Sequence, residues 1–125
     1  MSYLELMKSV LKQEAYAILS SADKLTNTQI ESLEKVFVRL LKSRGSLIFL
    51  GVGKSGQIGE KLAATFSSLG LPSFFLHPTE ALHGDLGRVK PEDYFVLISK
   101  SGSTEELFKL IPFLSSWKSF KSIAI

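Results

Sequence analysis

The chain has 125 residues, of which 45% are hydrophobic and 22% charged, and it contains no cysteine. The apolar content suffices for one compact core and excludes a disordered chain. The absence of thiols excludes a disulfide framework and a thiolate metal site. The net charge of +3 comes from 15 basic and 12 acidic side chains that are interleaved along the chain, without the basic tract that follows a nucleic-acid backbone.

The apolar runs are far shorter than the ~20 residues that a membrane-crossing helix needs. The N-terminal segment carries Glu5 and Glu14, where a signal peptide would have a basic and then wholly apolar stretch. We therefore expect a cytoplasmic protein that binds neither nucleic acid nor membrane.

Two amphipathic helices are predicted at the start of the chain. Apolar residues recur every three to four positions over residues 4–18 and again over residues 30–41. This spacing places them on one face of a helix, and we expect each stripe to be buried. Thr28 is the expected N-cap of the second helix, and Gly45 lies just past its end.

Short apolar runs alternate with helical patterns after Gly45. The predicted strands are 47–50, 74–76, 94–99 and 123–125, the predicted helices are 57–69 and 104–114, and a polar loop runs from 77 to 91. In the first of these helices we expect an inward face made of Ile58, Leu62, Ala63 and Phe66.

The alternation predicts a three-layer α/β/α fold with a mainly parallel sheet and right-handed crossovers, of the flavodoxin-like or Rossmann-like type. The pattern stops on the first residues of a strand. We therefore expect one partial domain over residues 1–125, with leading helices in 1–44, the first strand–helix units in 45–125, and a continuation beyond Ile125.

A glycine loop over residues 51–56 (Gly-Val-Gly-Lys-Ser-Gly) follows the first predicted strand and opens a helix. Such a loop lets the backbone approach an anion closely. It matches the dinucleotide pattern G-x-G-x-x-G, but no carboxylate follows about twenty residues on, near Leu76, and a nucleotide P-loop would need glycine in place of Ile48. A turn that serves packing alone is the other interpretation. Lys54 argues against it, because a cation at a helix N-terminus is unfavourable unless an anion or a reaction uses it.

A second loop over residues 99–104 (Ser-Lys-Ser-Gly-Ser-Thr) follows the third predicted strand and again leads into a helix. Its hydroxyls, together with exposed helix amides, can give several hydrogen bonds to one phosphate. The alternative is an ordinary helix start, with Thr104 as N-cap and Glu105 and Glu106 in the first turn.

Both histidines lie after the second predicted strand. His83 belongs to a glycine-rich segment, His-Gly-Asp-Leu-Gly, and is predicted as a functional residue about as readily as a surface one. His77 is more typical of a surface or hydrogen-bonding residue. Two histidines without cysteine or an acid at ligand spacing do not predict a metal site.

These segments together resemble the sugar isomerase (SIS) domain family and, within it, the arabinose-5-phosphate isomerases. The resemblance covers residues 45–114, and the segments that carry it are 51–56, 63–66, 72–78, 80–81, 83–87 and 99–102. The run from the lysine loop to His-Gly-Asp-Leu-Gly is specific to the isomerases, whereas the serine loop alone indicates the wider family. The resemblance implies an enzyme that interconverts D-ribulose 5-phosphate and D-arabinose 5-phosphate through an enediol, for the octulosonate sugar (Kdo) of lipopolysaccharide. It implies that the enzyme uses no cofactor.

The resemblance also implies roles for single residues. The family's active-site lysine falls on Lys54, one of its glutamates on Glu106 and its His-Gly-Asp histidine on His83. The predicted sugar-phosphate-binding residues are Gly53, Ser55, Ser99, Ser101, Gly102 and Thr104. The sequence departs from the family at Lys100, often Asn, and at Ser103, usually Glu.

The family's remaining catalytic glutamate and histidine, and the CBS modules of many members, would lie beyond this chain. We therefore do not expect the chain alone to turn over substrate. The apolar leading helices and the family's multimers predict a homo-oligomer, a dimer or tetramer. A non-catalytic sugar-phosphate-binding regulatory module is the alternative function, and nucleotide binding at the first loop is a weaker one.

Overall fold

A computed structural model of the chain describes residues 1–116 and 120–125. These residues form two compact units, 1–37 and 38–125. The helices are α1 (Tyr3–Asp23), α2 (Asn27–Ser43), α3 (Lys54–Ser68), α4 (Pro78–Leu82) and α5 (Glu105–Ser115), with a 3₁₀ helix η1 (Asp85–Arg88). The strands are β1 (Leu47–Leu50), β2 (Ser73–Phe75), β3 (Tyr94–Leu97) and β4 (Ser122–Ala124).

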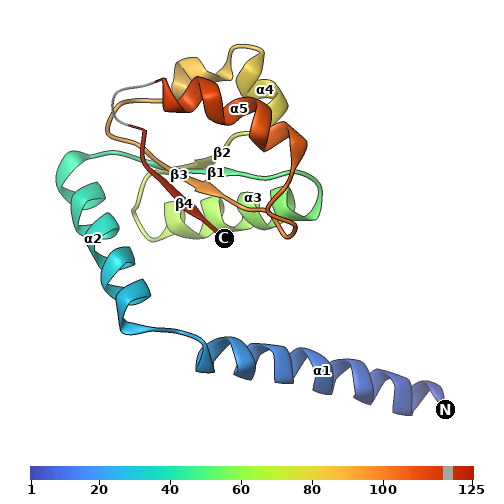
Figure 1. Cartoon of the computed structure of the whole chain (residues 1–125). Coiled ribbons are helices and arrows are strands. Elements are labelled where there is room, and N and C mark those ends of the chain that lie inside the picture. Colours follow the sequence, from blue (N-terminus) through green and yellow to red (C-terminus); the bar gives the residue numbers. More distant parts are fainter. Residues whose placement is uncertain (117–119) are drawn as a thin grey trace. The chain divides into compact units, whose positions relative to one another are not determined.

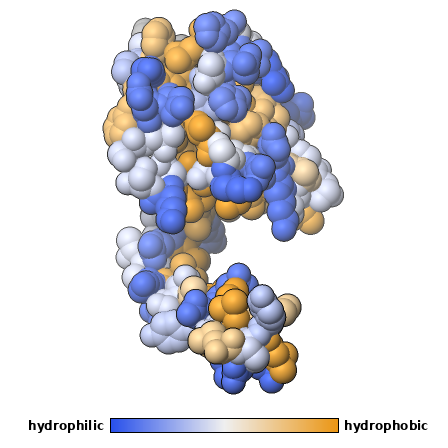
Figure 2. Space-filling view, turned by 90° about the vertical axis from the view of Figure 1, so that its right-hand side faces the viewer, coloured by the Kyte–Doolittle hydropathy of each residue, from blue (hydrophilic) through white to orange (hydrophobic). Residues whose placement is uncertain are grey.

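Helix α1 forms where the apolar spacing predicts it and begins with a capping box. The Ser2 hydroxyl accepts a hydrogen bond from the Glu5 amide, and the Glu5 carboxylate accepts one from the Ser2 amide at 2.7 Å. The expectation of a buried stripe is wrong, because none of the residues of α1 is buried. Figure 2 shows apolar side chains on the surface of this helix. A unit that consists of α1 and part of α2 is too small to cover that face.

Helix α2 is capped two residues before the predicted N-cap. Thr26 caps it: the Thr26 hydroxyl accepts from the Gln29 amide at 3.3 Å, and the Gln29 side chain accepts from the Thr26 amide at 2.9 Å. Thr28 lies inside the helix instead. The Thr-x-x-Gln spacing of a capping box was the signal for the correct residue. The expected burial of the apolar stripe is wrong for most of α2 as well: Leu40 is its one buried residue, whereas Ile30, Leu33 and Leu41 are exposed.

The strands form one parallel sheet in the order β2-β1-β3-β4. Helix α3 covers one face, and α4 and α5 cover the other (Figure 1). The predicted three-layer parallel architecture is therefore confirmed. No helix in the described residues is both long enough and apolar enough to cross a membrane.

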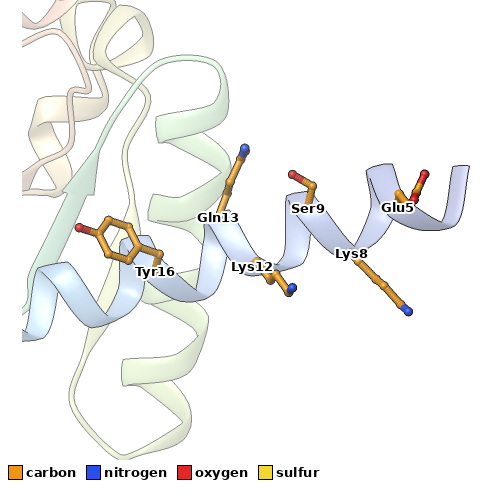
Figure 3. Close-up of a pocket in the computed structure, with 6 residues that line it drawn as sticks. All are labelled: Glu5, Lys8, Ser9, Lys12, Gln13 and Tyr16. Atoms are coloured by element: carbon orange, nitrogen blue, oxygen red, sulfur yellow. The ribbon is translucent and has the colours of Figure 1, made fainter. Parts of the chain in front are cut away.

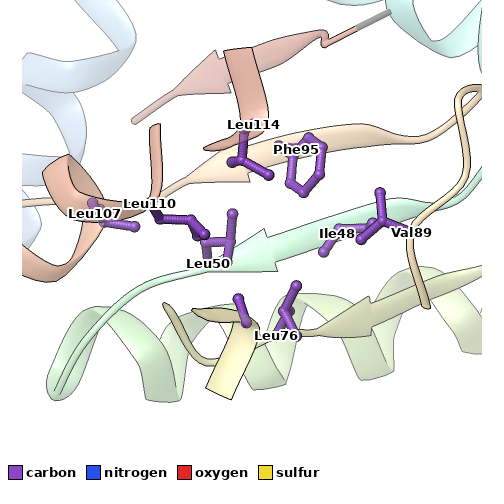
Figure 4. Close-up of a cluster of buried hydrophobic side chains, with 9 residues drawn as sticks. Ile48, Leu50, Leu76, Val89, Phe95, Leu107, Leu110 and Leu114 are labelled. Atoms are coloured by element: carbon purple, nitrogen blue, oxygen red, sulfur yellow. The ribbon is translucent and has the colours of Figure 1, made fainter. Parts of the chain in front are cut away.

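Alternating side chains of the central strand supply both layers of the core. Ile48 and Leu50 of β1 enter a cluster with Phe95 of β3 and with leucines of α5 (Figure 4). Phe49, between them, stacks on Phe66 of α3 with ring centroids 5.8 Å apart. A strand buried on both faces reads as a continuous apolar run, as the sequence of β1 does.

Helix α3 differs from its predicted form in its start and its inner face. It begins at Lys54, three residues before the predicted Gln57, and Ile58 is 53% exposed rather than inward. The buried residues are Gly56, Gly59 and Ala63. The reason is the Phe75 ring of β2, which lies against the glycines and leaves room only for small residues.

The segment from His77 to Pro91, predicted as a loop, contains α4 and η1. His77 caps α4, with Pro78 as its first residue, a position that suits a residue without an amide proton. Helix α4 packs against α5. The short helix was missed because its five residues are too few to show a helical period.

Candidate functional site

The glycine loop and the serine loop leave neighbouring strands at the same edge of the sheet. β1 and β3 pair in register as far as Leu50 and Leu97, and the Ile98 amide donates to the Leu50 carbonyl at 2.9 Å. The chain then turns to α3 on one face and to α5 on the other (Figure 1). The carboxyl ends of parallel strands at such a switch in direction are where open α/β sheets bind ligands.

The glycine loop fixes the start of α3 close to the end of β1. A Cβ at Gly51 would lie 2.8 Å from the Ser55 carbonyl carbon, so the turn admits no side chain there. Gly53, the N-cap, has φ +62° and gives α3 no side-chain cap. Lys54 is exposed as the first residue of the helix, and Ser55 is half-buried. The first amides of α3 are therefore open to an anion.

The serine loop is shaped by its own hydroxyls. The Ser99 and Thr104 hydroxyl oxygens lie 2.7 Å apart, and the Gly102 amide donates to the Ser99 hydroxyl at 3.0 Å. The Ser103 amide donates to the Ser101 hydroxyl at 3.1 Å. Thr104 is the N-cap of α5 by position, as the alternative interpretation has it, but its hydroxyl caps no amide of that helix. This helix start is open too.

The two glutamates of the first turn of α5 have different surroundings. The Glu105 carboxylate forms an ion pair with Lys109 at 2.7 Å, and the hydrogen bond and charge of Lys109 hold the pKa of Glu105 below its ordinary value. Glu106 is half-buried, and its carboxylate accepts no hydrogen bond from any described residue. Of the two, Glu105 forms an ion pair and Glu106 does not, although the charge of Glu106 also acts on Lys109.

His83 is exposed at the C-terminal end of α4, where its amide donates to the Glu80 carbonyl at 3.0 Å. His83 follows α4 and Lys54 begins α3, and these two helices cover opposite faces of the sheet (Figure 1). Within the described residues, no hydrogen bond joins the His83 side chain to Lys54 or to the serine loop. The structure thus places the two loops at the ends of neighbouring strands, and His83 at the end of a helix that packs against α5.

A cavity of about 310 Å³ adjoins the serine loop. Three of the predicted binding residues, Ser99, Gly102 and Thr104, line it. The remaining lining is mostly apolar and comes from the end of β3, from α5 and from the chain end: Leu97, Leu107, Phe108, Ile111, Ala124 and Ile125. This apolar wall was not predicted from the sequence, although the spacing of 107, 108 and 111 on one helix face was its signal.

A larger hollow, about 550 Å³, lies along α1 (Figure 3). All of its lining side chains come from that single helix, from Glu5 to Tyr16, so it is an open surface without converging groups. In residues 1–116 and 120–125 no group of three or more His, Asp or Glu side chains is placed to hold a metal ion.

Residues 40–125 match the family described as SIS domain. Over 117 residues the chain is 46% identical to the "Probable arabinose 5-phosphate isomerase" of Haemophilus influenzae, a match that covers 94% of this chain and 34% of the relative. It is 40% identical to the arabinose 5-phosphate isomerase KpsF of Escherichia coli, over 89% of this chain and 33% of the relative. The chain thus spans about a third of the length of these relatives.

A solved structure with the same fold holds a ligand. It is an Escherichia coli CFT073 protein in complex with arabinose 5-phosphate, with a TM-score of 0.79 and 38% sequence identity to this chain. The match covers 99% of this chain and 66% of that protein.

Proposed function

Because the chain belongs to the SIS domain family, we propose that its two carboxyl-end loops form the substrate-binding part of an isomerase that interconverts D-ribulose 5-phosphate and D-arabinose 5-phosphate. One observation carries the proposal: the two helices that start at the switch between β1 and β3 both lack a side-chain cap. Their free amides favour an anionic group between the loops.

The proposed anchor of the substrate phosphate is the serine loop. A phosphate has several acceptor oxygens, and the loop offers hydroxyls of Ser99, Ser101 and Thr104 beside the open amides of α5. Gly102, with φ +67°, turns the backbone so that the loop closes on itself. On the neighbouring strand, Gly53 and Ser55 belong to the second open helix start.

The proposed reaction moves one proton between adjacent carbons. A base removes a proton from C1 of the ketose, and the electron pair forms an enediolate with negative charge on O2. Return of a proton to C2 and transfer of the hydroxyl proton from O1 to O2 complete the aldose. We assign Lys54 to stabilise the enediolate oxygen, Glu106 to the carbon-bound proton and His83 to the proton transfer between oxygens.

The proposal includes the pathway, the cellular location and the oligomeric state of the enzyme. The arabinose 5-phosphate would supply the octulosonate sugar of lipopolysaccharide in the cytoplasm, and the enzyme would be a homo-oligomer. Because this chain spans about a third of its isomerase relatives, we propose that turnover needs a chain completed to their length.

Binding is tested on the 125-residue chain by NMR titration with arabinose 5-phosphate and with unphosphorylated arabinose. We expect the amides of residues 54–56 and 99–106 to shift with the phosphorylated sugar only. Ser101→Ala should weaken binding about fivefold, the value of one hydrogen bond, whereas Ser115→Ala, an exposed serine at the far end of α5, should not. Equal affinity for both sugars would refute the phosphate anchor.

Catalysis is tested in a chimera that continues this chain with the remaining part of the Haemophilus influenzae relative. In D₂O an isomerase places deuterium at C2 of arabinose 5-phosphate, whereas a regulatory module binds the sugar without exchange. Lys54→Ala should slow the exchange by about 100-fold or more with little change in affinity. Lys61→Ala, an exposed lysine of the same helix, is the control.

A further inference from the structure

The His77 ring lies on the same side of the sheet as α3, although His77 follows a different strand. Side chains alternate along β2 and its extension: Phe74 and Leu76 pack into the α5-side core, whereas Phe75 faces α3. The His77 ring meets the Phe75 ring edge-on, with centroids 6.4 Å apart and planes at 76°. The same Phe75 ring lies 3.3 Å from where a Cβ of Gly56 would be. Phe75 thus sits between His77 and the first turn of α3.

The hydrogen bond that His77 makes also fixes which ring nitrogen is a donor. The Thr79 amide donates to His77 Nδ1 at 3.2 Å, so in the neutral ring the proton is on Nε2. Among the described residues Nε2–H has no acceptor, and the ring is half-buried. A single donor of fixed identity therefore stands unused at the carboxyl edge of the sheet.

The strand order places this donor at a useful distance from the serine loop. β1 lies between β3, which leads to the serine loop, and β2, which leads to His77. Two strand spacings amount to about 10 Å, comparable to the length of an extended pentose phosphate. A substrate anchored at the serine loop and lying across the start of α3 would reach His77 with its carbonyl end.

We propose that the Nε2–H of His77 donates a hydrogen bond to a sugar oxygen at the carbonyl end of the substrate and selects phosphates of pentose length. The inference rests on the proposed function, because it needs the phosphate on the serine loop. The proposed donor is the imidazole side chain, and the amides of the short helix α4 have no part in this contact.

The test separates the capping role of His77 from the donor role. In His77→Asn the side-chain oxygen can still accept from the Thr79 amide, since Asn is a good N-cap, but the Nε2–H is lost. We expect an unchanged melting temperature and about tenfold weaker binding of arabinose 5-phosphate to the 125-residue chain, measured by NMR titration. Binding of inorganic phosphate and of glycerol 3-phosphate, which is too short to reach His77, should be unchanged.

The possible results distinguish a failure of the His77 inference from a failure of the proposed function. Equal affinity of wild type and His77→Asn for arabinose 5-phosphate would overturn the inference and leave the proposed function standing. Equal weakening for inorganic phosphate would also overturn it, because His77 would then only support the fold of the site. If the wild-type chain binds none of the three ligands, the proposed function fails, and the inference fails with it. Thr79→Ala keeps the amide and the imidazole and is the matched control.

Discussion

The two ends of the parallel sheet differ in whether nearby backbone amides have side-chain hydrogen-bond partners. At the amino end, Asp93 is only 2% exposed, and its carboxylate accepts from the Ser46 amide and from the Lys90 amide, both at 2.7 Å. At the carboxyl end, α3 and α5 begin without any side-chain cap. The other α-helices, α1, α2 and α4, are capped by Ser2, Thr26 and His77.

We interpret the paired amides at the amino end as serving the stability of the fold and the unpaired amides at the carboxyl end as serving ligand binding. Backbone amides in a fold normally find a partner, because an unpaired polar group costs free energy when it is buried. The amino end follows that rule with side chains of the chain itself. At the carboxyl end His77 caps α4 in the same way, but the first amides of α3 and α5 have no side-chain partner, which is the arrangement expected where a ligand will be the partner.

The largest expected effect is at the amino end. Asp93→Ala removes two charge-assisted hydrogen bonds and leaves two amides unpaired near the core. We expect the free energy of unfolding in urea to fall by about 3 kcal/mol. Asp23→Ala, at the exposed end of α1, should change it by less than about 0.5 kcal/mol. A loss at Asp93 no greater than at Asp23 would contradict the contrast between the two ends.

A pair of threonine substitutions then compares a capped helix with an open one. Thr26→Ala removes the cap of α2, and we expect a loss of helical signal and about 1 kcal/mol of stability. Thr104→Ala removes a hydroxyl that bonds to Ser99 and to no helix amide, so it should affect phosphosugar affinity more than the helix. Circular dichroism measures the helical signal and the stability, and NMR titration measures the phosphosugar affinity. The reverse pattern would show that α5 is capped after all.

The smallest expected effect concerns pH at the capped start of α1. The hydrogen bond from the Ser2 amide holds the pKa of Glu5 below its ordinary value, and the Ser2 hydroxyl adds to this. A carboxylate with a lowered pKa stabilises the folded helix above its unfolded pKa, and this contribution is lost as pH falls through the folded pKa. Amide shifts of residues 2–6 should therefore report fraying in acid, and Glu5→Gln should remove that pH dependence.

Local pattern was a good guide to the elements that carry their own periodicity. The run Leu47–Leu50 is a strand because four consecutive apolar residues fit a strand buried on both faces. Helix α5 starts at Glu105, one residue from its predicted start, because Thr104 and the acidic first turn mark a helix start. In the same way, the sequence predicts that the glycine and serine loops follow strand ends, because each comes directly after an apolar run.

Other features depend on partners distant in the sequence. The inner face of α3 is made of glycines rather than Ile58 because the Phe75 ring, from the next strand, occupies that space. The stripe of α1 has ideal spacing, yet the described residues of its unit offer nothing large enough to bury it.

The amino-acid sequence by itself determined the alternation of strands and helices, the parallel sheet and the two loops suited to an anion, because periodicity and turn chemistry are local properties. Only the tertiary structure decided that β1 and β3 are neighbours, that Asp93 accepts a hydrogen bond from the Ser46 amide, and that the Phe75 ring occupies the inner side of α3. Strand order and side-chain pairing arise from packing between residues far apart in the chain, and no local pattern encodes them.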